Sequence, residues 1–447
     1  MKMAISSPLL TDYYQLSMLE VYVERGIHGK ASFELFFRRL PPTRNFLVSA
    51  GLEQAVDFLL GLEFSQEHLS YLEELGLGRS LLRFLEEFEF TGDVWAMPEG
   101  TVFFENEPIL RVEAPLPQAQ LVETRLINIL HFQTLIASKA ARVCLAARGK
   151  PVIDFGFRRS HEANAGLLGA RACYIGGFGA TATVEAGRLY GIPVTGTMAH
   201  SFILAHESEE AAFRNFIDTH PQNPVLLIDT FDTLGAAHIV TRLYHEYLKK
   251  GVKIKGVRID SGDLLELSKK VRQIFDEARC QELSIFVSGG LDELEIQRLV
   301  ENGAPIDGFG VGTLVNTSAD VPFLDCAYKM VEYEGEAKMK FSKGKATLPY
   351  AKQVFRQCSG EHVADVLARA SERLPGRPLL EKVVERGKAL VQRESLEVIG
   401  SRAQREIASL PDGFRELKRH VTHVPALSPK LQEYLSRATA KNSSLAS

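Results

Sequence analysis

In the middle of this 447-residue chain, small polar and charged residues follow a series of short apolar runs, at the points where strands would end. The segment 191–202 reads G-I-P-V-T-G-T-M-A-H-S-F, so that Thr197, His200 and Ser201 follow the apolar run 192–194. From this stretch alone, a histidine that only holds the fold and a histidine that does chemistry are equally good interpretations. Similar clusters elsewhere in the chain favour the second.

Five further runs end in the same way. The residues that follow them are Asp154, Arg158 and Arg159; Asp229, Thr230, Asp232 and Thr233; Arg258, Asp260, Ser261, Gly262 and Asp263; Ser288, Gly289 and Gly290; and Gly310, Gly312 and Thr313. Each cluster has an ordinary structural explanation, because aspartates cap helices, glycines make tight turns and an arginine pair suits a solvated surface. Six such clusters are hard to explain by capping alone, since parallel α/β folds place ligand sites at the carboxyl ends of their strands.

The residue types in these clusters suit a phosphorylated sugar. Glycines at two adjacent strand ends allow backbone N–H groups to approach an anion, and the next helix N-terminus favours negative charge. Arg158 and Arg159 are suitable phosphate partners. Asp260 and Asp263 suit ribose hydroxyls or a hydrated Mg²⁺. Further cations come from a basic segment that contains Lys343, Lys345, Lys352 and Arg356.

Alternating strand and helix patterns must position these clusters. Strands are predicted at 151–155, 192–195, 225–228, 256–259, 284–287 and 308–311, with a possible further strand at 326–332. Helices are predicted at 208–216, 233–249, 264–278 and 292–302. A repeat of roughly 30 residues indicates βαβ units. Six repeats suit an irregular TIM-like α/β barrel better than a small open sheet.

Two other regions flank the barrel, which is assigned to residues 131–340. Residues 1–130 include a helical pattern at 11–24 and an aromatic-rich strand at 31–37, which predicts an N-terminal α+β domain. Residues 341–447 begin with the basic loop and are expected to be mainly helical and to pack on the N-terminal domain.

Composition excludes several classes of protein. The chain has 52 basic and 56 acidic residues, a net charge of −4, and so lacks the basic excess typical of nucleic-acid binding. No apolar run is long enough for a transmembrane helix, and the first residues do not form a signal peptide. The five cysteines include no closely spaced pair and are interpreted as reduced thiols. We expect a cytoplasmic protein without nucleic-acid or membrane partners.

These motifs together resemble the nicotinate phosphoribosyltransferases, a family of type II phosphoribosyltransferases. The resemblance runs from T-D-Y-Y-Q at Thr11 to K-Q-V-F-R at Lys352. Its most specific pieces are D-F-G-F-R-R (154–159), Y-I-G-G-F (174–178), G-T-M-A-H-S-F (196–202), L-L-I-D-T-F-D-T (226–233), G-V-R-I-D-S-G-D-L (256–264) and D-G-F-G-V-G-T (307–313). The chain departs from the family pattern at 160–164, at Gly289-Gly290 and at Tyr350.

The resemblance implies a reaction and its partners. Nicotinate and phosphoribosyl pyrophosphate would give nicotinate mononucleotide and pyrophosphate in NAD salvage. Mg²⁺ would assist, and ATP would act as a co-substrate whose hydrolysis is coupled through a phosphorylated histidine. The resemblance also implies a homodimer with shared active sites.

Carried onto this sequence, the resemblance assigns the phosphorylated histidine to His200, which we take as catalytic together with Asp260. The pyridine substrate is expected to lie at Arg158, with Tyr14 of the partner subunit reaching in. The expected phosphoribosyl pocket contains Asp260, Ser288, Gly289, Gly290, Gly310 and Gly312. Further substrate-binding candidates at the strand ends and in the basic segment are Ser201, Arg258, Thr313 and Lys352, and no metal ligands are assigned.

One position bears on substrate choice. Relatives that use nicotinamide carry an aspartate where Ala182 stands, and an aspartate would repel a carboxylate. Ala182 leaves Arg158 free to pair with the carboxylate of nicotinate. Two alternatives remain open: a nicotinamide-using enzyme, and a non-catalytic nucleotide-binding relative.

Overall fold

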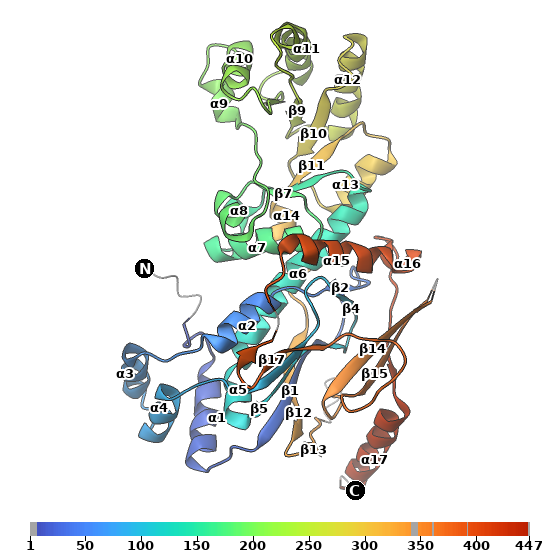
Figure 1. Ribbon diagram of the computed structural model, residues 1–447. Coiled ribbons are helices and arrows are strands. Elements are labelled where there is room, and N and C mark those ends of the chain that lie inside the picture. The colour runs from blue at the N-terminus through green and yellow to red at the C-terminus, as the bar shows by residue number, and fades with distance from the viewer. Residues whose placement is uncertain (1–6, 341–346, 360–361, 391, 446–447) are drawn as a thin grey trace. The chain divides into compact units, whose positions relative to one another are not determined.

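The computed structural model describes residues 7–340, 347–359, 362–390 and 392–445, and the chain divides into two compact units (Figure 1). The first unit comprises residues 1–138 and 323–447, and the second comprises residues 139–322. Helix α6 (Glu123–Ala147) begins in the first unit and ends in the second.

The first unit is built around a seven-stranded sheet. Its interior strand β1 (Lys30–Phe37) pairs antiparallel with β5 (Pro108–Pro115) and with β12 (Cys326–Tyr333). All of β1 except its first residue is buried, which fits a strand covered on both faces. The remaining strands of this sheet are β13 (Glu336–Ala337), β3 (Asp93–Ala96), β17 (Glu381–Glu385) and β18 (Lys388–Ala389).

The later part of the first unit begins with a β-hairpin, so the expectation of a mainly helical C-terminal part is wrong there. Strands β14 (Lys352–Ser359) and β15 (His362–Arg369) pair antiparallel, with Arg356 opposite Asp365. These two charged side chains form a buried ion pair of 2.7 Å across the hairpin. These two charges are therefore internal to a sheet, and helix begins only at α15 (Leu396–Ala408) in this part of the unit.

The other elements of the first unit are shorter. They are helices α1 (Tyr13–Glu24), α2 (Leu52–Leu60), α3 (Gln66–Glu74), α4 (Arg79–Glu86), α5 (Leu116–Leu121), α16 (Asp412–Arg415) and α17 (Pro429–Leu445), and strands β2 (Leu47–Val48), β4 (Val102–Phe103), β16 (Arg377–Pro378) and β19 (Ala426–Leu427). Within the described parts of both units, none of the helices combines the length and apolar character needed to span a bilayer.

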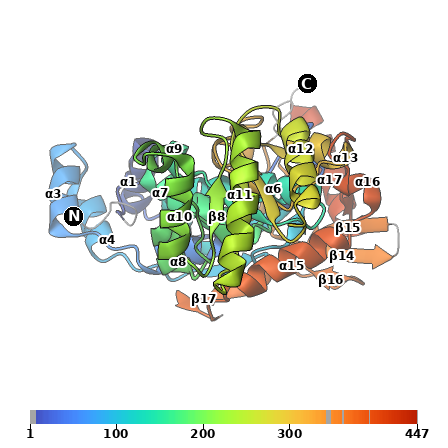
Figure 2. The same ribbon diagram turned by 90° about the horizontal axis from the view of Figure 1, so that it is seen from above.

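The second unit is a six-stranded parallel sheet with helices between its strands (Figure 1). Its strands, in spatial order, are β7 (Ala180–Thr181), β6 (Val152–Asp154), β11 (Gly308–Val311), β10 (Ser284–Ser288), β9 (Gly256–Ile259) and β8 (Val225–Leu227). The helices are α7 (Ala163–Ile175), α8 (Val184–Tyr190), α9 (His200–Leu204), α10 (Glu209–Thr219), α11 (Thr233–Lys249), α12 (Leu264–Glu277), α13 (Glu293–Glu301) and α14 (Thr313–Asn316). Helices α10, α11 and α12 lie side by side (Figure 2). The predicted mixed α/β architecture is present.

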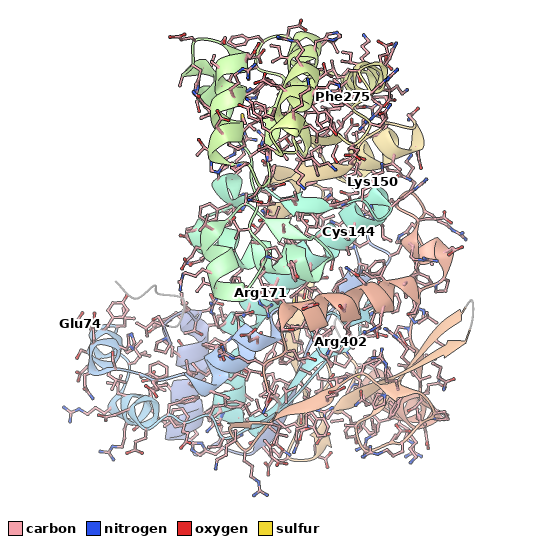
Figure 3. The ribbon with its side chains drawn as sticks, turned by 45° about the horizontal axis from the view of Figure 1, so that its top comes forward. Glu74, Cys144, Lys150, Arg171, Phe275 and Arg402 are labelled. Atoms are coloured by element: carbon pink, nitrogen blue, oxygen red, sulfur yellow. The ribbon has the colours of Figure 1, made fainter. Side chains whose placement is uncertain are left out.

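Apolar strands and capped helices explain this arrangement. The strand residues Leu226, Val257 and Ile285 are fully buried, and so is Phe275 on α12, which Figure 3 labels. Aspartates that follow three of the strands cap the next helices, which is the ordinary role of aspartate at this position. Asp232, Asp263 and Asp292 accept backbone N–H groups from the first turns of α11, α12 and α13. Asp260 has no such role and remains available to the site.

Two predicted strands have a different place. The second strand of the parallel sheet is β7 rather than 192–195, which contributes only a bridge between Val194 and Thr181. Pro193 lacks an N–H group and Val194 is 50% exposed, so this segment is a poor internal strand. The predicted strand at 326–332 is β12, which belongs to the antiparallel sheet of the first unit and does not extend the parallel one.

Candidate active site

The carboxylate of Asp154 joins three segments at the carboxyl edge of the parallel sheet. Asp154 ends β6 and is 1% exposed. Its Oδ1 accepts hydrogen bonds from the backbone of Gly156 (2.9 Å) and the side-chain amide of Asn316 (2.8 Å). Its Oδ2 accepts one from the hydroxyl of Thr181 (2.7 Å). Burial raises the pKa of Asp154, and these three bonds to the carboxylate oppose that rise.

Arg158 lies on a short 3₁₀ turn (Phe157–Arg159) that follows this junction. A Cβ atom on Gly156 would lie 1.5 Å from the Nδ2 of Asn316, so only glycine allows the chain to enter the turn here. Arg158 and Arg159 are both exposed. Arg159 donates to the hydroxyl of Thr313 at 3.2 Å, and Arg158 faces a cavity.

This cavity has a volume of about 460 Å³ and mixes apolar and charged walls. Its lining includes Phe155, Phe157, Ala182, Arg158, Arg258 and Asp260. Arg258 also donates to the hydroxyl of Thr197 at 2.6 Å. Burial lowers the pKa of Arg258, while the charges of Asp260 and Asp229 oppose that effect. The side chain of an arginine stays charged at neutral pH. The cavity therefore has an aromatic wall and charges of both signs, since Glu185 also lines it.

His200 is held between two strand ends. It begins helix α9 instead of ending a strand. Its Nδ1 lies 3.1 Å from the Oγ1 of Thr230, and its Nε2 lies 3.9 Å from the Oδ2 of Asp260. The side chain is 39% exposed, so the ring is accessible and is not a core histidine.

Asp260 is oriented by its neighbours. Its backbone N–H donates to the Oδ2 of Asp229 (3.0 Å), and the hydroxyl of Ser261 donates to the same oxygen (2.6 Å). The hydroxyl of Ser288 donates to the Oδ1 of Asp260. Gly289 has φ 91°, and a Cβ atom there would lie 2.0 Å from the backbone oxygen of Asp260. The two strand ends fit together only with glycine at this position.

The other predicted phosphate-binding residues lie at the same edge. Gly290 follows Gly289 in the turn after β10, Gly310 lies in β11, and Gly312 precedes α14, which begins at Thr313. The structure thus places these residues beside Asp260 and Arg159, within one unit. Their binding of an anion stays a prediction.

Three predicted residues have other surroundings. Ser201 is exposed on α9, next to His200 in the chain. Tyr14 is 51% exposed on α1 of the first unit. Lys352, also in the first unit, is buried, forms a 2.7 Å ion pair with Glu34 and donates to two backbone carbonyls. Arg356 is similarly occupied, and Lys343 and Lys345 lie outside the described residues.

Two residues of the site were not predicted from the sequence, and a third was predicted without a role. Thr181 and Asn316 bind Asp154, and Thr230 binds His200. Thr230 lies within the D-T-F-D motif, whose recurrence at a strand end is a usable signal. Thr181 and Asn316 have no local pattern, because their role depends on contacts between segments that are distant in sequence.

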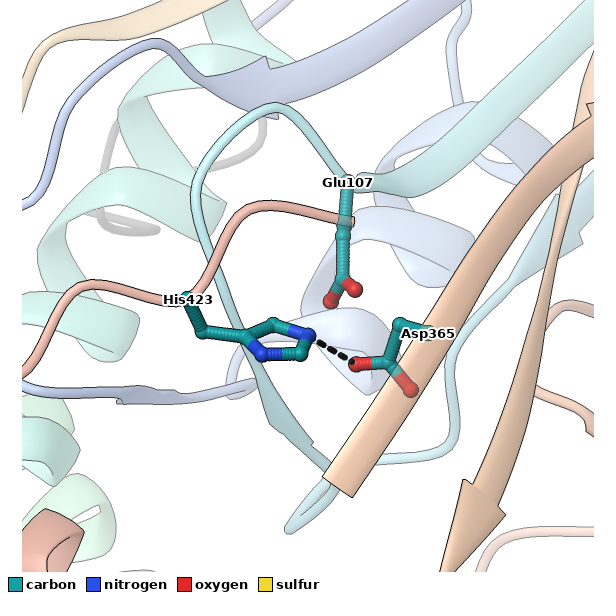
Figure 4. A group of neighbouring side chains, drawn as sticks. All are labelled: Glu107, Asp365 and His423. Carbon is teal, nitrogen blue, oxygen red and sulfur yellow. Dashed lines mark ion pairs between the residues drawn. The ribbon is translucent and has the colours of Figure 1, made fainter. Parts of the chain in front are cut away.

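A second acidic group lies in the first unit. Ligand-type atoms of Glu107, Asp365 and His423 lie within 4.8 Å of one another (Figure 4). The guanidinium of Arg356 already neutralises this group, with bonds of 2.9 and 2.7 Å to Asp365 and an approach of 3.7 Å to Glu107. Burial, reinforced by the charge of Asp365, raises the pKa of Glu107. We interpret the group as a buried ion pair beside a neutral carboxyl, and not as a metal centre.

The chain is similar to known proteins over most of its length. A family model described as the nicotinate phosphoribosyltransferase (NAPRTase) N-terminal domain matches residues 9–131, and one described as the nicotinate phosphoribosyltransferase (NAPRTase) family matches residues 151–371. A nicotinate phosphoribosyltransferase of Mycobacterium tuberculosis is 45% identical over 414 residues, which cover 92% of this chain and 89% of the relative. That of Bacillus subtilis is 45% identical over 361 residues, covering 78% and 73%. The crystal structure of human nicotinic acid phosphoribosyltransferase matches with a TM-score of 0.84 at 27% identity, covering 96% of this chain and 99% of that one.

The buried carboxyl of Glu107 yields a prediction about stability. The unfolded chain ionises Glu107 above its ordinary pKa of 4.5, whereas the folded protein keeps the proton, so this residue makes the free energy of unfolding fall as pH rises. Glu107→Gln keeps the shape without the ionisation. We therefore expect Glu107→Gln to gain stability relative to the parent as the pH rises from 5 to 8.

Chemical denaturation at several pH values measures this difference. Glu105→Gln, at a partly exposed neighbour, is the matched control and should follow the parent. Parallel curves for parent and Glu107→Gln would contradict the interpretation. A loss of parental stability on adding a chelator, absent in the variant, would show that the group holds a metal instead.

Proposed function

This chain belongs to the nicotinate phosphoribosyltransferase family, and we propose that its reaction takes place at the polar edge of the parallel sheet. The activity converts nicotinate and phosphoribosyl pyrophosphate into nicotinate mononucleotide and pyrophosphate, a step of NAD salvage. The observation that carries the proposed location is the cavity shared by Arg158, Arg258 and Asp260, which combines an aromatic wall with cationic and acidic groups.

Nicotinate binds in the part of this cavity next to Arg158. Phe155 and Phe157 offer apolar surface for the pyridine ring, and the exposed guanidinium of Arg158 pairs with the carboxylate. Ala182 lines the same cavity and brings no charge. This arrangement favours an anionic pyridine over an uncharged amide.

The phosphoribosyl group lies toward Asp260 and the glycine turns. The pyridine nitrogen attacks C1 of the ribose, a C–N bond forms, and the C–O bond to pyrophosphate breaks, so that no protein nucleophile is needed. Asp260 binds the ribose hydroxyls and faces the positive charge that develops on the sugar. Phosphate oxygens are bound by Arg258, by the hydroxyls of Ser201, Ser288 and Thr313, and by the backbone at Gly289, Gly290, Gly310 and Gly312.

The carboxylates near this pocket also fit Mg²⁺. Asp229 and Asp260 offer the hard oxygen ligands that hydrated Mg²⁺ prefers, and the Oδ1 of Asp229 is buried without a hydrogen-bond partner in the described part of the chain. Mg²⁺, when bound, neutralises charge on the pyrophosphate.

ATP serves as a co-substrate through His200. An imidazole nitrogen attacks the γ-phosphorus of ATP, a P–N bond forms and ADP leaves; water later breaks the P–N bond and releases phosphate. Thr230 and Asp260 hold the ring in the orientation that this transfer needs. The phosphorylated ring adds negative charge and acceptor oxygens beside the glycine turns, which orders the pocket for phosphoribosyl pyrophosphate.

Three features of the larger arrangement are part of the proposal. We propose that the second unit is an irregular, open TIM-like barrel. Its last strand β11 pairs with its first strand β6, which supports a cyclic strand order, while β7 and β8 lie at the two edges of the sheet. We assign the transferase domain to 131–340, between an N-terminal domain (1–130) and a C-terminal region (341–447). The N-terminal family model ends at residue 131, in support of the first boundary, whereas residues 323–340 include β12, which pairs in the sheet of the first unit.

The active enzyme is a cytoplasmic homodimer in which Tyr14 of the partner subunit completes the pyridine pocket. The exposure of Tyr14 on α1, beside the equally exposed Tyr13, suits such a contact. Lys352 contributes to phosphate binding only if its ion pair with Glu34 opens.

Substrate choice provides a first test. The parent should use nicotinate and use nicotinamide poorly, because Arg158 pairs with a carboxylate. Ala182→Asp places a like charge beside that carboxylate and should lower kcat/KM for nicotinate roughly tenfold or more while improving use of nicotinamide. Ala182→Asn, of equal size and uncharged, is the control. Equal turnover of the two pyridines by the parent would refute the assignment.

Arg158→Ala removes the charge-assisted bond to the carboxylate, worth about 1.5–3 kcal/mol. We expect the KM for nicotinate to rise roughly 10- to 100-fold, with a smaller change in the KM for phosphoribosyl pyrophosphate, in steady-state assays that vary each substrate. Arg159→Ala removes an adjacent exposed charge and controls for net charge. A change confined to the KM for phosphoribosyl pyrophosphate would reassign Arg158 to phosphate binding.

His200→Asn keeps part of the size and hydrogen bonding of the ring. We expect a folded variant with nearly parental thermal stability, no ATPase, no acid-labile phosphate, and residual transfer that no longer responds to ATP. His206→Asn, in the same segment, should retain both activities. A stable His200→Asn enzyme that still hydrolyses ATP in step with product formation would rule out the role of His200.

A further inference from the structure

Glu162 has a backbone conformation that side-chain-bearing residues rarely adopt. Its φ is 87° and its ψ is 162°, a region populated almost entirely by glycine. Such a conformation persists only where the surrounding structure compensates for it. Glu162 lies three residues after the proposed pyridine-binding turn and directly before α7.

The chain reverses direction at Glu162. The Phe157–Arg159 turn is closed by bonds from the N–H groups of Arg159 and Ser160 to the carbonyls of Gly156 and Phe157, at 3.0 and 3.1 Å. Beyond the reversal, α7 passes the same turn again. A Cβ atom on Gly166 would lie 2.5 Å from the ring of Phe157, so this ring packs directly on the helix backbone.

The side chain of Glu162 compensates for the unusual backbone. Its Oε2 accepts the backbone N–H of Asn164 at 2.9 Å and caps α7. A carboxylate at a helix N-terminus also gains from the helix dipole. The backbone carbonyl of Glu162 accepts the N–H of Gly166 at 3.1 Å, which ties the reversal to the first turn of the helix.

We propose that Glu162 is a positioning residue for Arg158. Its reversal holds the Phe157–Arg159 turn against α7, and the turn in turn aims the guanidinium of Arg158 at the cavity. The backbone conformation at position 162, and not the carboxylate, sets the affinity for nicotinate; the carboxylate makes that conformation tolerable to a residue other than glycine. This inference rests on the proposed pyridine site.

Three substitutions separate these contributions. Glu162→Gly loses the cap but adopts the conformation freely, and its KM for nicotinate should stay within about threefold of the parent. Glu162→Ala loses the cap and still resists the conformation, so its KM for nicotinate should rise about tenfold or more, with little change in kcat or in the KM for phosphoribosyl pyrophosphate. Glu162→Gln keeps an acceptor oxygen and should resemble the parent.

The KM values of these variants distinguish a positioning role of Glu162 from a role in helix capping alone. A role in capping alone predicts that Glu162→Gly and Glu162→Ala behave alike, lowering thermal stability without changing the KM for nicotinate, and that outcome would overturn the proposal. Arg279→Ala, at another exposed residue with positive φ (56°), is the control for backbone strain remote from the pocket and should alter stability only. Arg158→Ala, assayed in parallel, tests the pyridine site itself. If that variant binds nicotinate normally, the site assignment fails; if only the Glu162 series is unresponsive, the positioning role alone fails.

Discussion

The buried carboxylate of Asp154 is the contact on which the candidate site depends. Without its hydrogen bonds, the loop after β6, strand β7 and helix α14 would each bury a polar group that has no partner. Each such group would lower the free energy of unfolding. With them, three segments far apart in the chain share one ionisable group. The exposed Arg158 and the partly buried Thr313 owe their positions to this buried carboxylate. The residues that face the ligand are therefore positioned by hydrogen bonds to a carboxylate buried at the edge of the sheet.

The sequence predicted most strands of the second unit, helices α10 to α13 and the edge at which the polar residues meet, because apolar runs and the residues after them are local signals. It did not predict β7, α7 or α8. Partners across that edge were not predictable. Nothing near Asn316 in the chain indicates that it binds Asp154, and the D-T-F-D motif marks Thr230 as a site residue without indicating that its partner is His200. The segment 192–195 was also predicted incorrectly. Its apolar run resembles a strand, but Pro193 has no N–H group to donate to a neighbouring strand.

Burial of charge was the main source of error in the first unit. Arg356 and Lys352 belong to a basic stretch that favoured phosphate binding, yet the side chains of both are almost completely buried and paired with acidic residues. Glu34 comes from the predicted strand at 31–37 and Asp365 from a strand that was not predicted, and in neither case did the sequence indicate the pairing. A sequence shows the sign of each charge but not its counter-ion, so charged strands and charged helices look alike until pairing is known.

Strand β1 of the first unit pairs with a strand that is synthesised much later, β12. Strand β1 pairs along one edge with β12, roughly 300 residues further along the chain, and at about 5–20 residues per second that interval lasts on the order of 15–60 s. During this time one edge of an aromatic, largely apolar strand lacks its partner on the nascent chain, while the second unit, a continuous stretch, is already complete. An unpaired edge of this kind is a template for aggregation. Production of the enzyme in a cell is therefore sensitive to translation rate and to chaperones that shield β1 until Cys326–Tyr333 arrives.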